Sequence, residues 1–148
     1  SGARTGVLRV PGIYAADRLP LERLQRGDPV LAADDDVHTN HIHADDLARL
    51  VCAALFRARG GRAWNAVDDT RLKMGDYFDL VADAFGLPRP PRLARAEIAR
   101  RLSPMALSFM AESRMVDNRR MARELRTALH HPTVADGIRD ALAQRARG

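Results

Sequence analysis

The stretch from Thr39 to Leu55 constrains the fold most, because it joins a predicted strand directly to a predicted helix. The alternating segment His41-Ile42-His43 is typical of a short strand. A helix is predicted over residues 45–58, and its first turn carries two acids, which the helix dipole favours. Apolar side chains recur at helical spacing and form the predicted core face: Leu47, Leu50, Val51, Ala54 and Leu55. Gly60-Gly61 is predicted to cap this helix.

Further strands and helices alternate along the first half of the chain. Val7 to Val10 is predicted to be a strand that ends in a tight turn at Pro11-Gly12. Other strands are expected at 29–31 and 63–67, and helices at 19–26, 76–85, 94–102, 104–111, 118–125 and from Thr133 onward. Ser103 is expected to cap the helix that starts at Pro104, and Thr133 with Asp136 resembles a capping box. The alternation predicts an α/β sheet followed by a helical tail.

Composition narrows the classes of partner. The 148 residues are about one domain's worth, with a formal net charge of +5. Lys73 is the only lysine among the 24 Lys and Arg residues, which leaves 23 arginines. Arginine suits bidentate recognition of carboxylate and phosphate, although such a number also fits a plain soluble surface. Nucleic acid is the least favoured partner, because no basic run is interleaved with aromatic side chains.

Several kinds of site are weighed and set aside. His38, His41 and His43 lie near five aspartates, but no known metal-binding spacing is present and the acids serve as turn formers, so no metal is expected. The single cysteine, Cys52, is predicted to be a packed, unreactive thiol. No run of about 18 apolar residues and no signal peptide is present, so we expect no membrane span and a cytoplasmic location.

Motifs for a complete oxidoreductase are missing from these residues. Gly2 and Gly6 do not form a Gly-x-Gly-x-x-Gly loop, and neither Tyr14 nor Tyr77 is followed by a lysine four residues later. No serine stands in a Gly-x-Ser-x-Gly elbow. The sequence therefore assigns no catalytic residue to this chain.

Three segments resemble a known family when taken in order. They are Leu8-Arg-Val-Pro-Gly-Ile-Tyr14, Asn40-His-Ile-His-Ala-Asp-Asp-Leu-Ala48 and Trp64-Asn-Ala-Val-Asp-Asp69. Together they are similar to the C-terminal half of extended short-chain dehydrogenases/reductases, the NAD-dependent epimerase/dehydratase group. The tail from Asp117 through Ile138 also resembles the closing helices of that group.

The resemblance implies a fold and a set of site residues. It implies the C-terminal portion of a Rossmann-like parallel sheet (residues 1–70) and a small, mostly helical substrate-side region (residues 71–148). Pro11, Gly12 and Ile13 would pass near the nicotinamide of NAD or NADP. Substrate contacts would come from Tyr14, from Arg18 as the strongest candidate, and from Arg71 and Arg114. The motif from His41 to Asp46 is interpreted as architectural.

The departures from the family pattern limit what the chain can do alone. The family's glycine-rich loop and Tyr-x-x-x-Lys pair lie upstream of the segment that matches Leu8, and Ala15 replaces a usual glycine. The chain is therefore expected to be catalytically incomplete, and to need an N-terminal half of the same protein or another copy. Its substrate would be a small carbonyl compound or a nucleotide-linked one. The alternatives are a non-catalytic module that binds an anionic ligand or a protein, and a basic nucleic-acid-binding or effector-binding domain.

Overall fold

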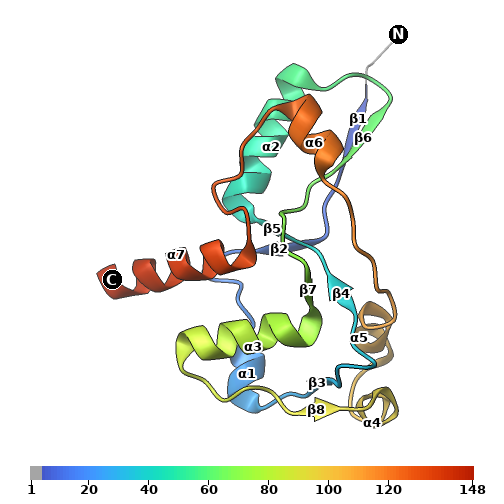
Figure 1. Cartoon of the computed structure of the whole chain (residues 1–148), viewed down its shortest axis with the longest axis vertical. Coiled ribbons are helices and arrows are strands. Elements are labelled where there is room, and N and C mark those ends of the chain that lie inside the picture. The colour runs from blue at the N-terminus through green and yellow to red at the C-terminus, as the bar shows by residue number, and fades with distance from the viewer. Residues whose placement is uncertain (1–4) are drawn as a thin grey trace.

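The computed structural model describes residues 5–148 and shows short strands, mostly parallel, joined by helices (Figure 1). Strand β1 (Gly6–Arg9) pairs in parallel with β6 (Arg62–Asn65), and β2 (Gly12–Tyr14) pairs in parallel with β5 (His41–His43). Strand β3 (Val30–Leu31) pairs in parallel with β8 (Arg92–Leu93), whereas β4 (His38–Thr39) runs antiparallel to β7 (Leu72–Lys73). The predicted α/β class is confirmed.

Seven helices are present in the described part of the chain. They are α1 (Leu21–Arg26), α2 (Ala44–Arg57), α3 (Met74–Phe85), α4 (Arg95–Ala99), α5 (Pro104–Phe109), α6 (Arg119–Leu125) and α7 (Val134–Arg147). Helices α2 and α6 lie beside β1 and β6 at one end of an elongated molecule (Figure 1). The other end holds α1, α3, α4 and α5, and α7 projects from the middle. No described helix is long and apolar enough to cross a membrane.

The core divides into three clusters along this length. The cluster under α2 and α6 contains Ile42, Leu50, Trp64, Ala66, Met121 and Leu125. The cluster around α3 and α7 contains Tyr14, Leu24, Val30, Tyr77, Phe78, Val81, Ala82, Val134 and Ile138. A third, small cluster joins Leu31, Ile98 and Met110. Because the first two clusters draw residues from both sides of residue 70, the division into 1–70 and 71–148 stays a prediction.

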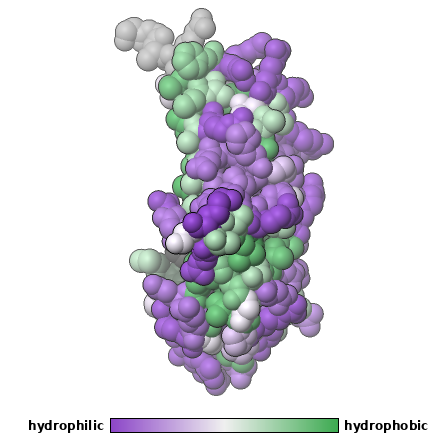
Figure 2. Space-filling model, turned by 90° about the vertical axis from the view of Figure 1, so that its left-hand side faces the viewer, coloured by the Kyte–Doolittle hydropathy of each residue, from purple (hydrophilic) through white to green (hydrophobic). Residues whose placement is uncertain are grey.

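The strand-to-helix junction forms as predicted, and Leu47, Leu50 and Ala54 of the predicted core face pack into the core. Leu50 is fully buried, whereas Val51 is 44% and Leu55 78% exposed, so those two predicted core residues lie on the surface. Cys52 is also exposed, which makes the prediction of a packed thiol wrong. The core covers only one side of α2, where α6 and β5 contact it. In Figure 2, hydrophobic surface lies near the top and again in the lower half of the face shown.

Helix ends were predicted with mixed success. Ser103 caps α5, and Thr133 with Asp136 forms a complete capping box for α7, both as predicted. Gly86 ends α3 in the left-handed conformation. Helix α2 instead ends at Ala58 in an extended conformation, so the predicted glycine cap is wrong. The expected turn at Pro11-Gly12 is also wrong, because the chain resumes there as β2.

Candidate functional site

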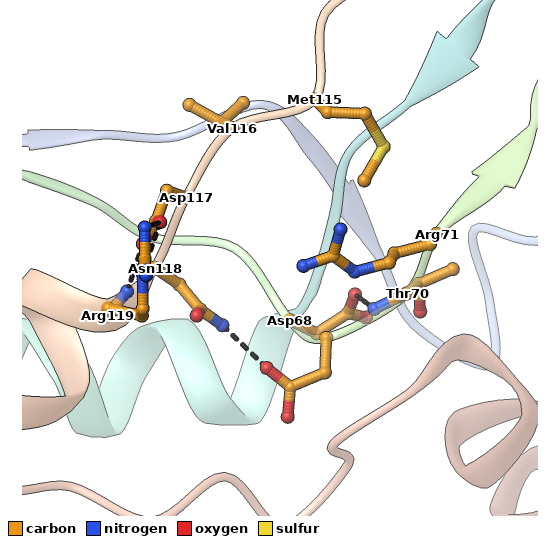
Figure 3. A pocket seen from close by; sticks show the side chains of 9 residues that line it. Asp68, Thr70, Arg71, Met115, Val116, Asp117, Asn118 and Arg119 are labelled. Carbon is orange, nitrogen blue, oxygen red and sulfur yellow. Dashed lines mark hydrogen bonds and ion pairs between the residues drawn. The ribbon is translucent and has the colours of Figure 1, made fainter.

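A cavity of about 550 Å³ opens where β6 ends (Figure 3). One wall is the segment that follows the strand, and the other is the segment that leads into α6. The lining residues are Asp68, Asp69, Thr70, Arg71, Met115, Val116, Asp117, Asn118 and Arg119. The carboxyl ends of parallel strands are where open α/β sheets bind their ligands, so this cavity is the candidate site.

Two asparagines hold the walls together. The side-chain amide of Asn65 donates a hydrogen bond of 2.9 Å to the backbone oxygen of Asp117. The amide of Asn118 donates to the backbone oxygen of Val67 at 3.0 Å and to a carboxylate oxygen of Asp69 at 2.8 Å. The Asn118 side chain therefore binds the facing wall, and it makes no side-chain cap on α6.

Asp68 is the buried carboxyl group of the cavity. Its side chain accepts a 2.8 Å bond from the backbone N–H of Thr70 through Oδ1, while Oδ2 has no hydrogen-bond partner among residues 5–148. Burial raises the pKa of Asp68 to about 6, although the hydrogen bonds from Thr70 act in the opposite direction. A carboxyl group with such a pKa can exchange a proton near neutral pH, which suits acid–base work or a bond to a ligand hydroxyl.

The two arginines of the cavity differ in what they contact. The guanidinium of Arg119 forms an ion pair with Asp117 on its own wall. Arg71 has no ion pair within the described residues and reaches over Asp68 toward the opposite wall (Figure 3). Its planar donors are available to an anionic group in the cavity. Of the predicted substrate residues, Arg71 is the one that lines this site.

The remaining predicted site residues lie outside the cavity lining. Gly12 and Ile13 belong to β2, with Pro11 immediately before it, and Ile13 is 39% exposed. Arg18 is exposed and closes a turn through its N–H to the Ala15 oxygen at 3.0 Å. Arg114 forms a 3.6 Å ion pair with Glu112 at the surface. Their roles in binding cofactor and substrate stay predictions.

Tyr14 is placed in the core rather than at a surface. It is 3% exposed, and its hydroxyl donates to the backbone oxygen of Thr133 at 3.2 Å. Burial, and after it the negative charge of Asp68, raises the pKa of Tyr14. In this arrangement the ring positions α7, and its predicted contact with substrate stays a prediction.

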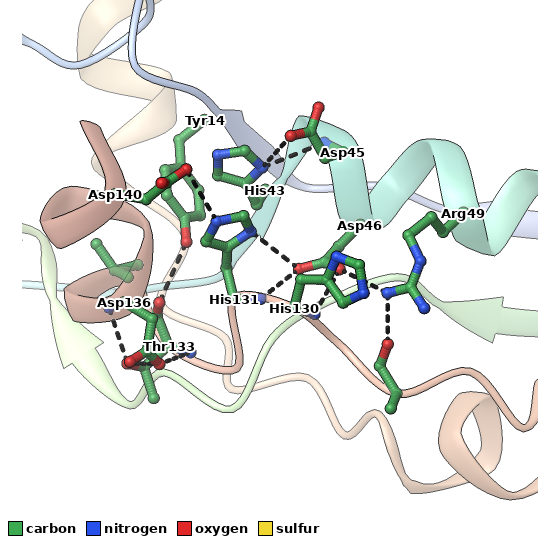
Figure 4. Close-up of polar contacts among 12 residues, drawn as sticks. Tyr14, His43, Asp45, Asp46, Arg49, His130, His131, Thr133, Asp136 and Asp140 are labelled. Carbon is green, nitrogen blue, oxygen red and sulfur yellow. Dashed lines mark hydrogen bonds and ion pairs between the residues drawn. The ribbon is translucent and has the colours of Figure 1, made fainter. Parts of the chain in front are cut away.

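The junction motif surrounds a fully buried carboxylate (Figure 4). Asp46 accepts the backbone N–H groups of His130 and His131 at 2.7 and 2.8 Å, and a bond from Arg49 at 3.3 Å. Burial alone would raise the pKa of Asp46, but these bonds outweigh it and lower the pKa. The His131 ring stacks on His43 with centroids 3.8 Å apart. The motif thus ties the start of α2 to the loop before α7, in keeping with the architectural interpretation.

Asp68, Asn118 and Arg119 were not identified as site residues from the sequence. Asp68 follows the strand predicted at 63–67, and Asn118 opens the helix predicted at 118–125. A signal was present, since acidic residues that follow a parallel strand stand at its ligand-binding end. Asn118 and Arg119 on the facing wall have no comparable sequence signal, because 51 residues separate Asn118 from Val67, to which it donates a hydrogen bond. Within residues 5–148, no group of three His, Cys, Asp or Glu side chains could hold a metal ion.

Comparisons with known proteins find similar folds among solved structures. No protein-family model and no curated protein matches the sequence. A functionally unknown conserved protein from Silicibacter pomeroyi is 30% identical, with a TM-score of 0.83 over 94% of this chain and 49% of that protein. The human epimerase family protein SDR39U1, solved with NADPH, is 17% identical, with a TM-score of 0.77 over 95% and 48%. UDP-glucose 4-epimerase from Thermotoga maritima, solved with UDP-glucose, is 14% identical, with a TM-score of 0.70 over 97% and 46%.

The chain spans about half the length of each of these structures. The predicted fold, an α/β structure that matches half of larger Rossmann-like folds, is therefore confirmed. Strand β1 pairs in parallel with β6, and the candidate cavity lies beyond the carboxyl end of β6.

Proposed function

We propose that this chain is the substrate-side C-terminal half of an NAD(P)-dependent epimerase, dehydratase or reductase. The observation that carries the proposal is the cavity at the carboxyl end of β6, in a fold shared with epimerase-type proteins. Arg71, Asn118 and Asp68 supply a cation, an amide and a buried carboxyl group within this one cavity. Such a set can bind and orient a polar substrate, whereas the sequence offers no glycine-rich loop and no Tyr-x-x-x-Lys pair for the chemistry itself.

The nicotinamide cofactor would meet this chain at Pro11, Gly12 and Ile13. This segment follows β1 at the carboxyl end of the strand, and Val10 and Ile13 expose apolar side chains on either side of Pro11. An exposed apolar edge fits the face of a nicotinamide ring. Bound NAD or NADP would supply the hydride acceptor or donor. An N-terminal half would supply the pyrophosphate-binding loop and the proton-transfer pair.

The substrate we favour carries a phosphate, as a nucleotide-linked sugar does. Arg71 is the support, because its guanidinium lines the cavity and has no ion pair within residues 5–148. Carboxylates of Asp69 and Asp117 are engaged with Asn118 and Arg119, so they do not neutralise Arg71 by direct contact. A small carbonyl compound without phosphate would use Asp68 and Asn118 but not Arg71.

Turnover by the full-length protein tests this proposal. We would measure kcat and KM for UDP-sugars and for small ketones in the wild type, in Arg71→Ala and in the control Arg101→Ala. Arg101 is exposed and is not one of the residues that line the cavity. Arg71→Ala is expected to raise KM for a UDP-sugar about tenfold, because a charge-assisted bond to phosphate is lost, and Arg101→Ala is expected to leave it unchanged. Turnover of ketones alone, insensitive to Arg71, would contradict the phosphate-bearing substrate. Absence of any turnover would favour the non-catalytic module.

A further inference from the structure

We propose that the chain carries a second ligand site, for a small phosphate-rich anion, at the opposite end of β6 from the candidate cavity. The site is a cavity of about 570 Å³ lined by Arg57, Arg59, Arg62, Arg123, Glu124 and Arg126. We name it the arginine groove. It lies where α2 ends, β6 begins and α6 ends, at the end of the molecule where these elements meet in Figure 1.

The charges of the arginine groove do not balance internally. Glu124 is its only acid, and that carboxylate is already shared. One oxygen forms a 3.3 Å ion pair with Arg62, and the other accepts a 2.9 Å bond from the indole N–H of Trp64. Arg57, Arg59, Arg123 and Arg126 form no ion pair within residues 5–148. Four unneutralised guanidinium groups around one cavity repel each other, and a multiply charged anion would relieve that repulsion.

Part of the arginine groove is held in position before any ligand binds. Nη1 of Arg57 donates to the backbone oxygens of Leu125 at 2.6 Å and of Arg126 at 3.0 Å. These carbonyls belong to the last turn of α6, where helix carbonyls need external donors. A guanidinium has five N–H donors, so Arg57 keeps donors free for a ligand after making these bonds. Its orientation is thus fixed by the fold at no cost to binding.

Arg126 shows a backbone conformation that arginine does not favour. It ends α6 with φ 49° and ψ 41°, and it is the one non-glycine residue with positive φ in the described chain. The corresponding positions of α1 and α3 are occupied by Gly27 and Gly86. A side chain is strained in this region, which is why glycine is usual there. An arginine at this position is explained if its guanidinium is needed in the cavity.

The lining indicates phosphate rather than a nucleic-acid base. Five arginines offer planar donors that match phosphate oxygens. No aromatic side chain lines the arginine groove, and the neighbouring Trp64 is 1% exposed, so there is no surface for base stacking. The volume is that of a small-molecule site. A diphosphate or triphosphate anion fits these features best.

Titration calorimetry on the full-length protein with inorganic tripolyphosphate tests the proposal. The test variant is Arg59→Ala/Arg123→Ala, because both side chains are exposed and make no hydrogen bond within the described residues. The matched control is Arg100→Ala/Arg101→Ala, which removes the same charge from two exposed arginines near α4. The expected result is binding that weakens about tenfold or more in the test variant and stays within about twofold in the control. Equal weakening in both would overturn the site.

Arg126→Gly separates a ligand role from a structural one. Glycine relieves the backbone strain, so the melting temperature is expected to rise while tripolyphosphate affinity falls. A rise in melting temperature with unchanged affinity would overturn the proposal. A duplex DNA titration completes the test. Binding of DNA but not of tripolyphosphate, with the same sensitivity to Arg59 and Arg123, would also overturn it. Turnover at the candidate cavity is independent of all these results.

Discussion

At the scale of single residues, Asp68 is buried and its Oδ2 has no hydrogen-bond partner among the described residues. Its carboxyl group therefore makes the stability of the protein depend on pH. The pKa of Asp68 is about 6 in the folded chain, against an ordinary value of 3.8. The folded state therefore holds the proton more tightly than the unfolded state. Below pH 4 this difference in pKa does not change the free energy of unfolding. As the pH rises toward and above 6, the free energy of unfolding falls, by about 3 kcal/mol at most.

Asp68→Asn is accordingly expected to stabilise the protein at pH 7.5, with a gain that fades below pH 4. Urea unfolding at several pH values measures this. A gain that is the same at pH 4 and pH 7.5, or no gain at all, would show that the carboxyl group is not held in a destabilising state. A group that costs stability and lines a cavity is typical of a functional site.

His41 has the opposite dependence on pH. Burial lowers the pKa of His41 to about 4 from an ordinary 6.5. The unfolded state takes up the proton first, so stability is lost as pH falls from 6.5 to 4, by about 3 kcal/mol. His41→Asn is expected to unfold with a weaker acid dependence than the wild type in this window. Parallel stability curves for the two proteins would contradict the assignment. In the wild type the effects of His41 and Asp68 offset each other between pH 4 and 6.

At the scale of elements, the sequence predicted most helices because their apolar spacing and caps are local. Thr133 and Asp136 lie three residues apart, and their capping box forms as expected. The predictions were wrong where contacts with segments distant in the sequence determine burial or pairing. Val51 and Leu55 continue the apolar pattern of α2, yet no described element covers them. Strands of two residues, such as β4 and β7, are defined by their pairing with each other. They are too short to show an alternating hydrophobic pattern.

The loop before α7 depends on the carboxylate of Asp46. Asp46→Asn replaces one acceptor oxygen with a donor that faces a backbone N–H, so the buried bonds to His130 and His131 cannot both persist. We expect a loss of about 3 kcal/mol in the free energy of unfolding. Asp45→Asn is the control, since the Asp45 side chain is 75% exposed, and it should change stability by less than about 0.5 kcal/mol. Similar losses in both variants would contradict the role of Asp46.

Helix α7 contains a glycine that its own sequence pattern does not explain. A methyl group on Gly137 would overlap the ring of Tyr14. Gly137→Ala is therefore expected to destabilise the protein by about 1–3 kcal/mol, although alanine is the better helix former. Adding Tyr14→Leu should recover part of the loss, because the shorter side chain leaves room. Thermal unfolding of the wild type and of these two variants measures both effects. A stabilised single variant would mean that α7 does not lie against Tyr14.

At the scale of the whole molecule, the ordered motifs predicted the fold, whereas the candidate site was only partly predictable. Arg71 was predicted only as a weaker substrate candidate than Arg18, on the family resemblance, and it lines the cavity. Asn118 and Arg119 reach the cavity through the long connection after α3, and their position depends on packing that no local pattern encodes. Arg114, the other weaker candidate, forms an ion pair with Glu112 at the surface.

The central claim is that this chain forms half of a nicotinamide-dependent protein, and one measurement tests it most directly. The full-length protein would be titrated with NADPH and with NADH while nicotinamide fluorescence is followed. We predict saturable binding of one or both, weakened when Ile13→Asp places a charge where the nicotinamide ring is expected. Saturable binding that is unchanged by Ile13→Asp would contradict the placement of the cofactor. No binding of either dinucleotide would contradict the claim itself.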